Sequence, residues 1–267
     1  MTDIDVKACT TLVRTIADDI AARGANAGQD AAIGDMIAHV RAVSEVAEIR
    51  MRSALAGLYP AIGWTSEEGR PAGDDYWLYD PIDGAYHWLQ GLPLWASSLV
   101  LVRCGEPVLS IVYDPAMAEA FVAVLGGGTR CNDVPVRVSP KANLAAAVVG
   151  TAVPPLGQVS EAEQDEALGL IRTVARAVFV VRPIAAASLQ LAYVAAGRLD
   201  AYFENGRDAA DWLAGALLIR EAGGIVTDLA GDRFGWSGDG ILSASAVLHP
   251  AMRATIDRVR EPASEIA

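Results

Sequence analysis

Five apolar, strand-like segments follow one another between residues 76 and 138, with no helical pattern between them. They cover residues 76–79, 97–103, 107–113, 120–125 and 134–138. Consecutive strands joined by turns predict an antiparallel sheet rather than parallel strands with helical crossovers. The glycine triplet at 126–128 is predicted to form a hairpin turn rather than a phosphate-binding loop, because no Lys-Ser/Thr pair follows it.

Two long helices are predicted before this sheet. From Val6 to Ile20, apolar side chains recur at helical spacing and mark one buried stripe. A second helix is predicted over residues 31–58 and ends before Tyr59-Pro60, because a residue that precedes proline disfavours the α conformation. Its inward-facing stripe is predicted to comprise Ile33, Ile37, Val40, Val43, Val46 and Ile49.

After residue 140 the pattern becomes an alternation of strands and helices. Strands are predicted at 145–151, 177–181, 199–203, 225–228 and 241–245, and helices at 161–175, 188–196 and 208–222. This alternation favours a mixed sheet with helices packed on it. We therefore expect an α+β protein of layered α/β architecture. Its N-terminal subdomain is expected over residues 1–140 and its C-terminal subdomain over 141–267, and the two should share one interface because no linker separates them.

The composition excludes several classes of function. The chain has 267 residues and a formal net charge of −12, which repels nucleic acids and anionic membranes, so neither is an expected partner. Cys9, Cys104 and Cys131 are far apart and form no CxxC motif, which disfavours a zinc site and a disulfide framework. The N-terminal residues lack the apolar core of a signal peptide, and no run of 18 apolar residues is present. A reduced cytoplasmic setting is therefore the expectation.

Three stretches place acidic residues at the ends of apolar elements: Glu67-Glu68, Asp80-Pro81-Ile82-Asp83 and Asp211. If Glu67, Asp80, Asp83 and Asp211 converge, carboxylates within about 5 Å repel one another unless a proton or a cation lies among them. Ligands that are all oxygen suit Mg²⁺, and the backbone carbonyl of Ile82 is a further neutral donor.

Gly84 follows directly, and a glycine lets the backbone approach a bound group closely. If a helix begins at Ala85, its first N–H groups would point at an anion. A cation on one side and a helix N-terminus on the other would together form a phosphate site.

Each stretch also has a purely structural interpretation. Asp-Pro-x-Asp-Gly is ordinary turn chemistry, and Glu67-Glu68 fits a solvated loop. Asp208 and Asp211 fit a helix N-cap and a first-turn acid favoured by the helix dipole. The tryptophans Trp64, Trp77 and Trp88 fit a core better than a platform for stacking bases. Taken singly, the DPIDG stretch leaves the choice open, whereas Glu67-Glu68 and the Asp208–Asp211 stretch favour the structural interpretation.

Taken together, the motifs resemble the inositol monophosphatase family of Mg²⁺-dependent, lithium-sensitive phosphatases. The family motif Asp-Pro-Ile/Leu-Asp-Gly-Thr is similar to DPIDGA at 80–85, and its upstream Glu-Glu to Glu67-Glu68. Its C-terminal motif is similar to ADWLAG at 210–215 followed by EAGG at 221–224, and LAYVAAGRLDAYFE at 191–204 also resembles the family. The resemblance covers the chain from the second helix to about His249.

The resemblance implies a layered fold of alternating helix and sheet layers (αβαβα) and attack of a metal-activated water on a phosphate monoester, without a phosphoenzyme. It implies a small phosphorylated metabolite as substrate, Mg²⁺ as cofactor and a homodimer. The implied metal ligands are Glu67, Asp80, Asp83, Asp211 and the Ile82 carbonyl, with Glu67 and Asp83 as catalytic residues. The implied phosphate-binding residues are Gly84 and Ala85, the substrate-binding residues are Glu204, Ala185 and Ala186, and Glu68 and His87 would lie just behind these groups.

The sequence departs from the family pattern at several positions. The motif Thr, whose hydroxyl helps to activate the water in the family, is Ala85, and the Asn two positions later is His87. The Thr and Asp of the second helix correspond to Arg41 and Ser44, the pocket Gly-Ser to Ala185-Ala186, and the motif Trp to Ala210.

Two functions follow from the motifs and the departures. The first is a Mg²⁺-dependent phosphomonoesterase for an inositol- or sugar-phosphate-like ester. The second is a phosphatase-like protein that binds metal or phosphate with weak or no catalysis, because the hydroxyl is missing at Ala85.

Overall fold

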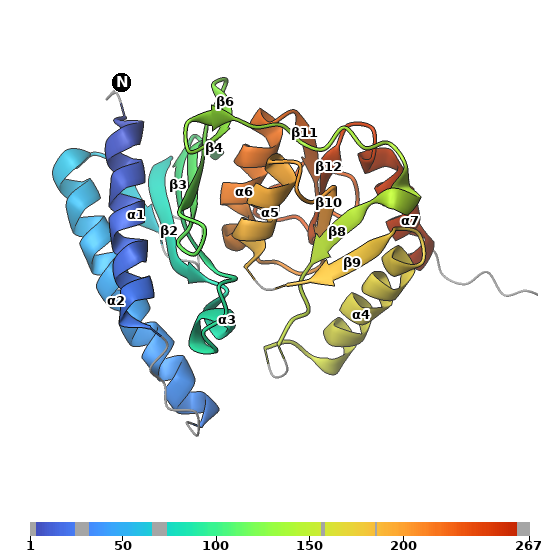
Figure 1. The fold of residues 1–267 in the computed structure, drawn as a ribbon, viewed down its shortest axis with the longest axis horizontal. Coiled ribbons are helices and arrows are strands. Elements are labelled where there is room, and N and C mark those ends of the chain that lie inside the picture. Colours follow the sequence, from blue (N-terminus) through green and yellow to red (C-terminus); the bar gives the residue numbers. More distant parts are fainter. Residues whose placement is uncertain (1–3, 25–31, 66–73, 156–157, 185, 261–267) are drawn as a thin grey trace, which may run out of the picture.

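The computed structural model describes residues 4–24, 32–65, 74–155, 158–184 and 186–260. Helices and sheets alternate as five layers: α1 and α2, a first sheet, α5 and α6, a second sheet, and α4 and α7 (Figure 1). This arrangement confirms the predicted α+β layered fold. The loops that contain Glu67, Glu68 and Ala185 lie outside the described residues.

The first layer consists of α1 (Val6–Arg23) and α2 (Ile33–Leu58). The predicted stripe of α2 was wrong at Ile33, Val46 and Ile49, which are 69%, 43% and 58% exposed. The buried positions are instead Ala47, Met51 and Leu55, which repeat every four residues and face α1 and β2. The small side chain of Ala47 belongs to this packed face, whereas the β-branched side chains that suggested the stripe lie on a neighbouring face of the helix.

The first sheet has seven strands in the order β1-β2-β3-β4-β5-β6-β7. Their bounds are β1 Gly63–Thr65, β2 Asp75–Asp83, β3 Ala96–Arg103, β4 Glu106–Asp114, β5 Glu119–Val124, β6 Gly128–Cys131 and β7 Val134–Pro135. All neighbours are antiparallel except β1 and β2, which pair in parallel. The fully antiparallel prediction is corrected at this edge, because β1 is a three-residue strand that the apolar pattern does not show. Gly126 and Gly127 turn the chain between β5 and β6, as predicted.

The middle layer is formed by α5 (Ala187–Ala195) and α6 (Ala209–Glu221), which are buried between the two sheets. Gly215 permits their close approach, because a Cβ at this position would lie 2.2 Å from the Cβ of Leu191. Trp77 and Trp88 belong to the core between the first two layers, as predicted, and Trp64 packs against that core.

The second sheet has the order β11-β12-β10-β8-β9 and is mixed, as predicted. Its strands are β8 Val148–Thr151, β9 Val180–Pro183, β10 Ala201–Glu204, β11 Gly224–Thr227 and β12 Ile241–Ser245. A 3₁₀ turn at Leu144–Ala146 precedes β8. The outer layer consists of α4 (Glu161–Ala175) and α7 (His249–Arg260).

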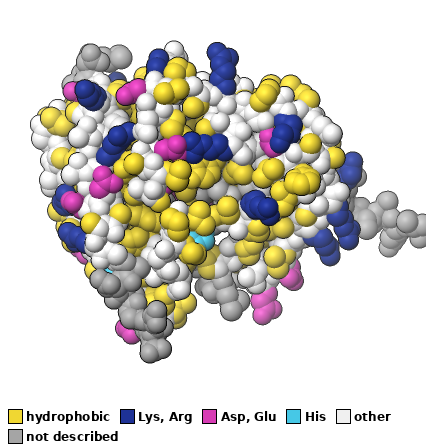
Figure 2. Space-filling view, in the orientation of Figure 1, with side chains coloured by type: hydrophobic (Ala, Val, Ile, Leu, Met, Phe, Trp, Pro, Cys, Tyr) yellow, Lys and Arg dark blue, Asp and Glu magenta, His cyan; other side chains and the backbone are white. Residues whose placement is uncertain are grey.

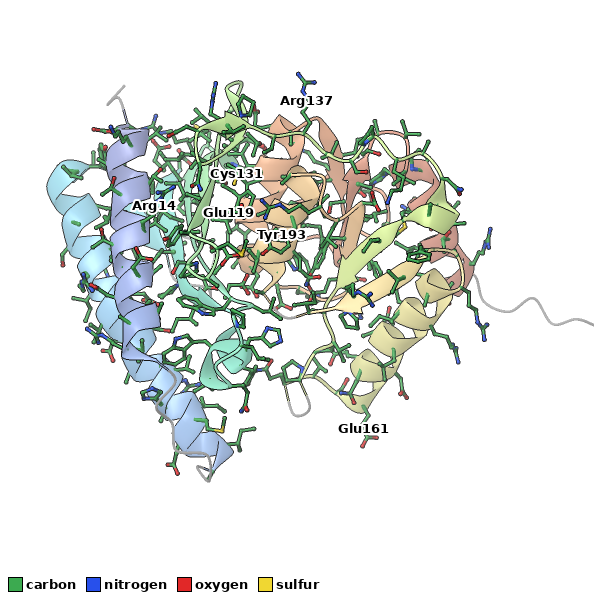
Figure 3. The ribbon with its side chains drawn as sticks, in the orientation of Figure 1. Arg14, Glu119, Cys131, Arg137, Glu161 and Tyr193 are labelled. Atoms are coloured by element: carbon green, nitrogen blue, oxygen red, sulfur yellow. The ribbon has the colours of Figure 1, made fainter. Side chains whose placement is uncertain are left out.

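Polar contacts hold α5 and the segment after it against the first sheet. Tyr193 in α5 donates a hydrogen bond to Asp114 of β4 at 2.9 Å. Arg198 donates to both oxygens of Glu119 at 2.5 and 2.7 Å and lies over the ring of Tyr193. Figure 3 shows Glu119 and Tyr193 at this boundary between sheet and helix. The two halves of the chain therefore share one interface, although the proposed subdomain division at residue 140 stays a prediction.

The exposed surface has no unusual concentration of charge on the face shown in Figure 2, where Lys and Arg side chains are scattered among hydrophobic and acidic ones. Within the described part of the chain, no helix is both long enough and apolar enough to cross a membrane.

Candidate active site

A cleft of about 1200 Å³ contains most of the site residues predicted from the sequence. Its walls come from α2, the β2–α3 turn, the ends of β8 and β10, the N-terminal part of α5 and the first turn of α6. The predicted residues that line it are Asp80, Ile82, Asp83, Gly84, Ala85, Ala186, Glu204 and Asp211. Glu67, Glu68 and Ala185 lie outside the described residues, so their positions stay predictions.

The DPIDG stretch forms a tight turn at the end of β2. The carboxylate of Asp80 accepts a hydrogen bond from the backbone N–H of Ile82 at 2.9 Å, and Ser97 donates to the carbonyl of Pro81 at 2.5 Å. Gly84 has a φ of +87° and caps α3 (Ala85–Leu89). A Cβ at Gly84 would lie 2.9 Å from the Cβ of Ala186, so only glycine fits this meeting of two walls.

Asp83 is buried, lines the cleft and is held by the first turn of α5. Its Oδ2 accepts hydrogen bonds from the backbone N–H of Ser188 at 2.7 Å and from the Ser188 hydroxyl at 2.5 Å. Burial raises the pKa of Asp83, although the hydrogen bonds from Ser188 oppose that shift. Sequence analysis missed Ser188, which lies in the first turn of an apolar helix and carries no motif of its own.

Glu204 ends β10 and lies half-buried in the wall of the cleft. Its Oε2 accepts hydrogen bonds from the Tyr202 hydroxyl and, at 2.9 Å, from the indole Nε1 of Trp212. Burial is the largest cause that raises the pKa of Glu204 to about 7. Near neutral pH this side chain therefore exists in both protonation states, so it is able to donate or accept a hydrogen bond.

Asp208 and Asp211 lie at the start of α6, which also lines the cleft. Asp208 is the N-cap residue, as its sequence position suggests, but its side chain makes no capping hydrogen bond. Burial raises the pKa of Asp208. Asp211 is in the first turn of α6, and both residues line the cleft.

Some of the positions that depart from the family motifs line the cleft, and others do not. Arg41 and Ser44 of α2 line the cleft, as does Ala85. His87 is half-buried in α3, and its Nδ1 lies 2.8 Å from the carbonyl oxygen of Leu94. This contact holds the imidazole against the loop that follows α3, and His87 is not among the residues that line the cleft.

The cleft is strongly acidic. Ten of its lining residues are acidic, and the only basic ones among the described residues are Arg41 and Arg207. No group of three or more His, Cys, Asp or Glu side chains within the described part of the chain is arranged closely enough to hold a metal ion. The donor types nevertheless fit Mg²⁺, since the predicted ligands that the structure describes are oxygen donors that face one cleft.

Comparison with known proteins agrees with this geometry. The model of the inositol monophosphatase family matches residues 1–261. An inositol-1-monophosphatase of Mesorhizobium japonicum is 36% identical over 230 residues, which cover 85% of this chain and 84% of the relative. A protein named Nus factor SuhB from Pseudomonas aeruginosa is 37% identical over 199 residues, covering 72% of this chain and 73% of the relative.

The fold comparison leads to the same group. The solved structure of Mycobacterium tuberculosis SuhB superposes with a TM-score of 0.79 at 28% identity and covers 95% of each chain. The match of the family model spans both sheets and every described residue that lines the cleft. This chain belongs to the inositol monophosphatase family.

Proposed function

We propose that this protein is a Mg²⁺-dependent phosphomonoesterase that hydrolyses a small phosphorylated metabolite of the inositol- or sugar-phosphate kind. One observation carries the proposal: Asp80 and Asp83 of β2, Glu204 of β10 and Asp211 of α6, from three separate elements, line a single cleft. A purely structural role for each acid would not require them to face one common space. Family membership supports the same reaction class.

The cation site is proposed to consist of Glu67, Asp80, Asp83, Asp211 and the carbonyl of Ile82. When bound there, Mg²⁺ would offset the carboxylate charge and lower the pKa of a water molecule. Asp83 supports this assignment, because its carboxylate is buried beside other acids and burial raises its pKa. A buried carboxylate in an acidic cleft is stabilised by a nearby cation.

The remaining residues are proposed to bind and orient the ester. The turn at Gly84 brings the backbone of Gly84 and Ala85 to the cleft, where their N–H groups would donate to phosphate oxygens. Glu204 would contact hydroxyl groups of the substrate, and Ala186, whose side chain has no polar atom, would shape the wall beside it. Glu67 and Asp83 would accept hydrogen bonds from the attacking water.

Release of inorganic phosphate from a panel of inositol, sugar, histidinol and nucleotide monophosphates tests the proposal, with Mg²⁺ and with a chelator. We expect turnover of at least one ester that requires Mg²⁺ and is abolished in Asp83→Asn, which has nearly the same shape but lacks the charge. Turnover no higher than that of Asp83→Asn on every ester would refute the enzyme assignment.

The second candidate function is a phosphatase-like binding protein with weak or no catalysis. It is favoured by Ala85, which lines the cleft without the hydroxyl of the family motif. The Pseudomonas aeruginosa relative, which is named a Nus factor, is compatible with such a role. Calorimetry would support this candidate if Mg²⁺ and phosphate bind and no ester of the panel is hydrolysed.

The homodimer and the cytoplasmic setting are also proposals. Support for a self-association surface comes from α2, where Ile33, Val46 and Ile49 are exposed apolar side chains. Light scattering after size-exclusion chromatography tests the dimer, for which we expect twice the mass of the chain.

A further inference from the structure

We propose that Ser188 is a positioning residue for Asp83 and that it limits this carboxylate to one available oxygen. The inference rests on the proposed function, because it assumes that Asp83 serves the cation site. In the structure, Oδ2 of Asp83 accepts two short hydrogen bonds from Ser188, at 2.7 Å from the backbone N–H and 2.5 Å from the hydroxyl. Ser188 is 1% exposed and Asp83 is 8% exposed, so solvent competes little for either bond.

Hydrogen bonds from Gln190 hold α5, the helix that contains Ser188, in place. The buried Gln190 donates from Nε2 to the carbonyl oxygens of Thr151 at 3.1 Å and of Ile184 at 2.5 Å. These bonds join α5 to the end of β8 and to the segment that precedes the helix. Ala186, with a φ of +69°, then directs the first turn of α5 toward the cleft. Ser188 is therefore held by packed elements of the second half of the chain, while its acceptor belongs to the first half.

The hydrogen bonds have a consequence for coordination. A carboxylate oxygen offers about two lone-pair directions, and Ser188 donates two hydrogen bonds to Oδ2. The backbone N–H groups of Ala187 and Leu189 also stabilise the Asp83 carboxylate. A cation at Asp83 would therefore be held through Oδ1 rather than through Oδ2. Mg²⁺ favours single oxygens in near-octahedral geometry, whereas Ca²⁺ commonly accepts both oxygens of one carboxylate. Ser188 thus favours the smaller ion through the geometry it imposes on Asp83.

The test uses metal binding in the absence of substrate. Calorimetric titration with Mn²⁺ alone, and separately with Ca²⁺, is compared for wild type, Ser188→Ala and Ser188→Thr. Loss of a hydrogen bond to a metal ligand typically weakens metal affinity about 10-fold or more, so we expect roughly that loss for Mn²⁺ in Ser188→Ala. We expect a smaller loss for Ca²⁺ and recovery in Ser188→Thr, which keeps the hydroxyl.

Ser110→Ala is the matched control, because Ser110 is a fully buried serine of β4 that does not line the cleft. We expect its Mn²⁺ affinity to equal that of wild type. If Ser188→Ala does not fold, Ser188→Cys replaces the hydroxyl with a weak donor of similar size, and the same loss is expected. The Mg²⁺ concentration that gives half-maximal turnover should rise in parallel, with the KM for the ester little changed.

The two proposals fail in different ways. Wild-type protein that binds no Mn²⁺ would overturn both the cation site and the role of Ser188. Wild-type protein that binds Mn²⁺, together with a folded Ser188→Ala whose Mn²⁺ affinity is unchanged, would overturn the role of Ser188 alone.

Discussion

The indole Nε1 of Trp212 donates a 2.9 Å hydrogen bond to Oε2 of Glu204, eight residues earlier in the chain. The family motif has its tryptophan directly before the aspartate, and that position is Ala210 here. Trp212 follows Asp211 instead, and it is buried with its polar atom toward the wall of the cleft. One helical turn of α6 thus supplies both Asp211 to the cleft and a hydrogen-bond donor to Glu204.

The raised pKa of Glu204 predicts how the free energy of unfolding changes with pH in the metal-free protein. Burial raises its pKa in the folded state from 4.5 to about 7. Between these values the folded protein holds a proton that the unfolded chain has released, so the free energy of unfolding decreases as pH rises through this window. After allowance for the partial exposure of the side chain, we expect a contribution on the order of 2 kcal/mol.

Urea unfolding in chelator at several pH values between about 4.5 and 8 checks this prediction, with Glu204→Gln as comparison. The amide of Glu204→Gln does not titrate, so the stability of this variant should decrease less across the window. Equal pH dependence in both proteins would show that Glu204 is not the group responsible.

The missing hydroxyl at Ala85 predicts a gain of turnover when it is restored. A positioned group that helps to transfer a proton is typically worth about 10²–10⁴ in rate. Since Ser44 stands where the family has a carboxylate, we expect only part of this gain in Ala85→Thr, about 10-fold in kcat with KM little changed. Ala85→Val has the same shape without the hydroxyl and should not increase kcat. An equal gain in both variants would assign the effect to packing.

The contacts of Glu221 predict that this part of the EAGG motif stabilises the fold and takes no part in the chemistry. Its carboxylate accepts hydrogen bonds from the backbone N–H groups of Gly126 at 2.9 Å and Gly128 at 2.8 Å. It therefore holds the β5–β6 hairpin onto the end of α6. We expect Glu221→Gln, which loses one acceptor, to lower the free energy of unfolding by about 1–2 kcal/mol in urea. Mn²⁺ affinity should be unchanged, and a weakened affinity would contradict the structural role.

Segments with local signals were predicted accurately from the sequence. The bounds of α4, Glu161–Ala175, coincide with the prediction because Ser160 and Glu163 form a capping box that fixes where the helix begins. The acids of the DPIDG turn and Asp211 were found because their spacing matches family motifs, and the structure brings the described ones to one cleft.

Features that depend on distant partners were missed. The buried face of α2 is set by α1 and β2, so the β-branched residues Val46 and Ile49 gave the wrong side of the helix. The hydrogen bonds of Ser188 go to Asp83, which is 105 residues away in the chain. A local sequence pattern does not reveal a contact between residues so far apart. The helix α7 was not predicted, although Pro250 at its first turn is compatible with a helix start.

The tight turn at Gly84 predicts that a single added methyl group strongly lowers the free energy of unfolding. Gly223 provides a control within the same chain. Gly84 and Gly223 both have a φ of +87°. A Cβ added at Gly223 would have no atom within 4 Å, whereas a Cβ added at Gly84 would lie 2.9 Å from the carbonyl oxygen of Leu94. The left-handed conformation costs a non-glycine residue about 1–2 kcal/mol, so Gly223→Ala should lose that much in the free energy of unfolding. Gly84→Ala should lose about 1–3 kcal/mol more because of overpacking. Urea unfolding of both variants measures the difference, and equal losses would mean that the walls at Gly84 and Ala186 separate easily.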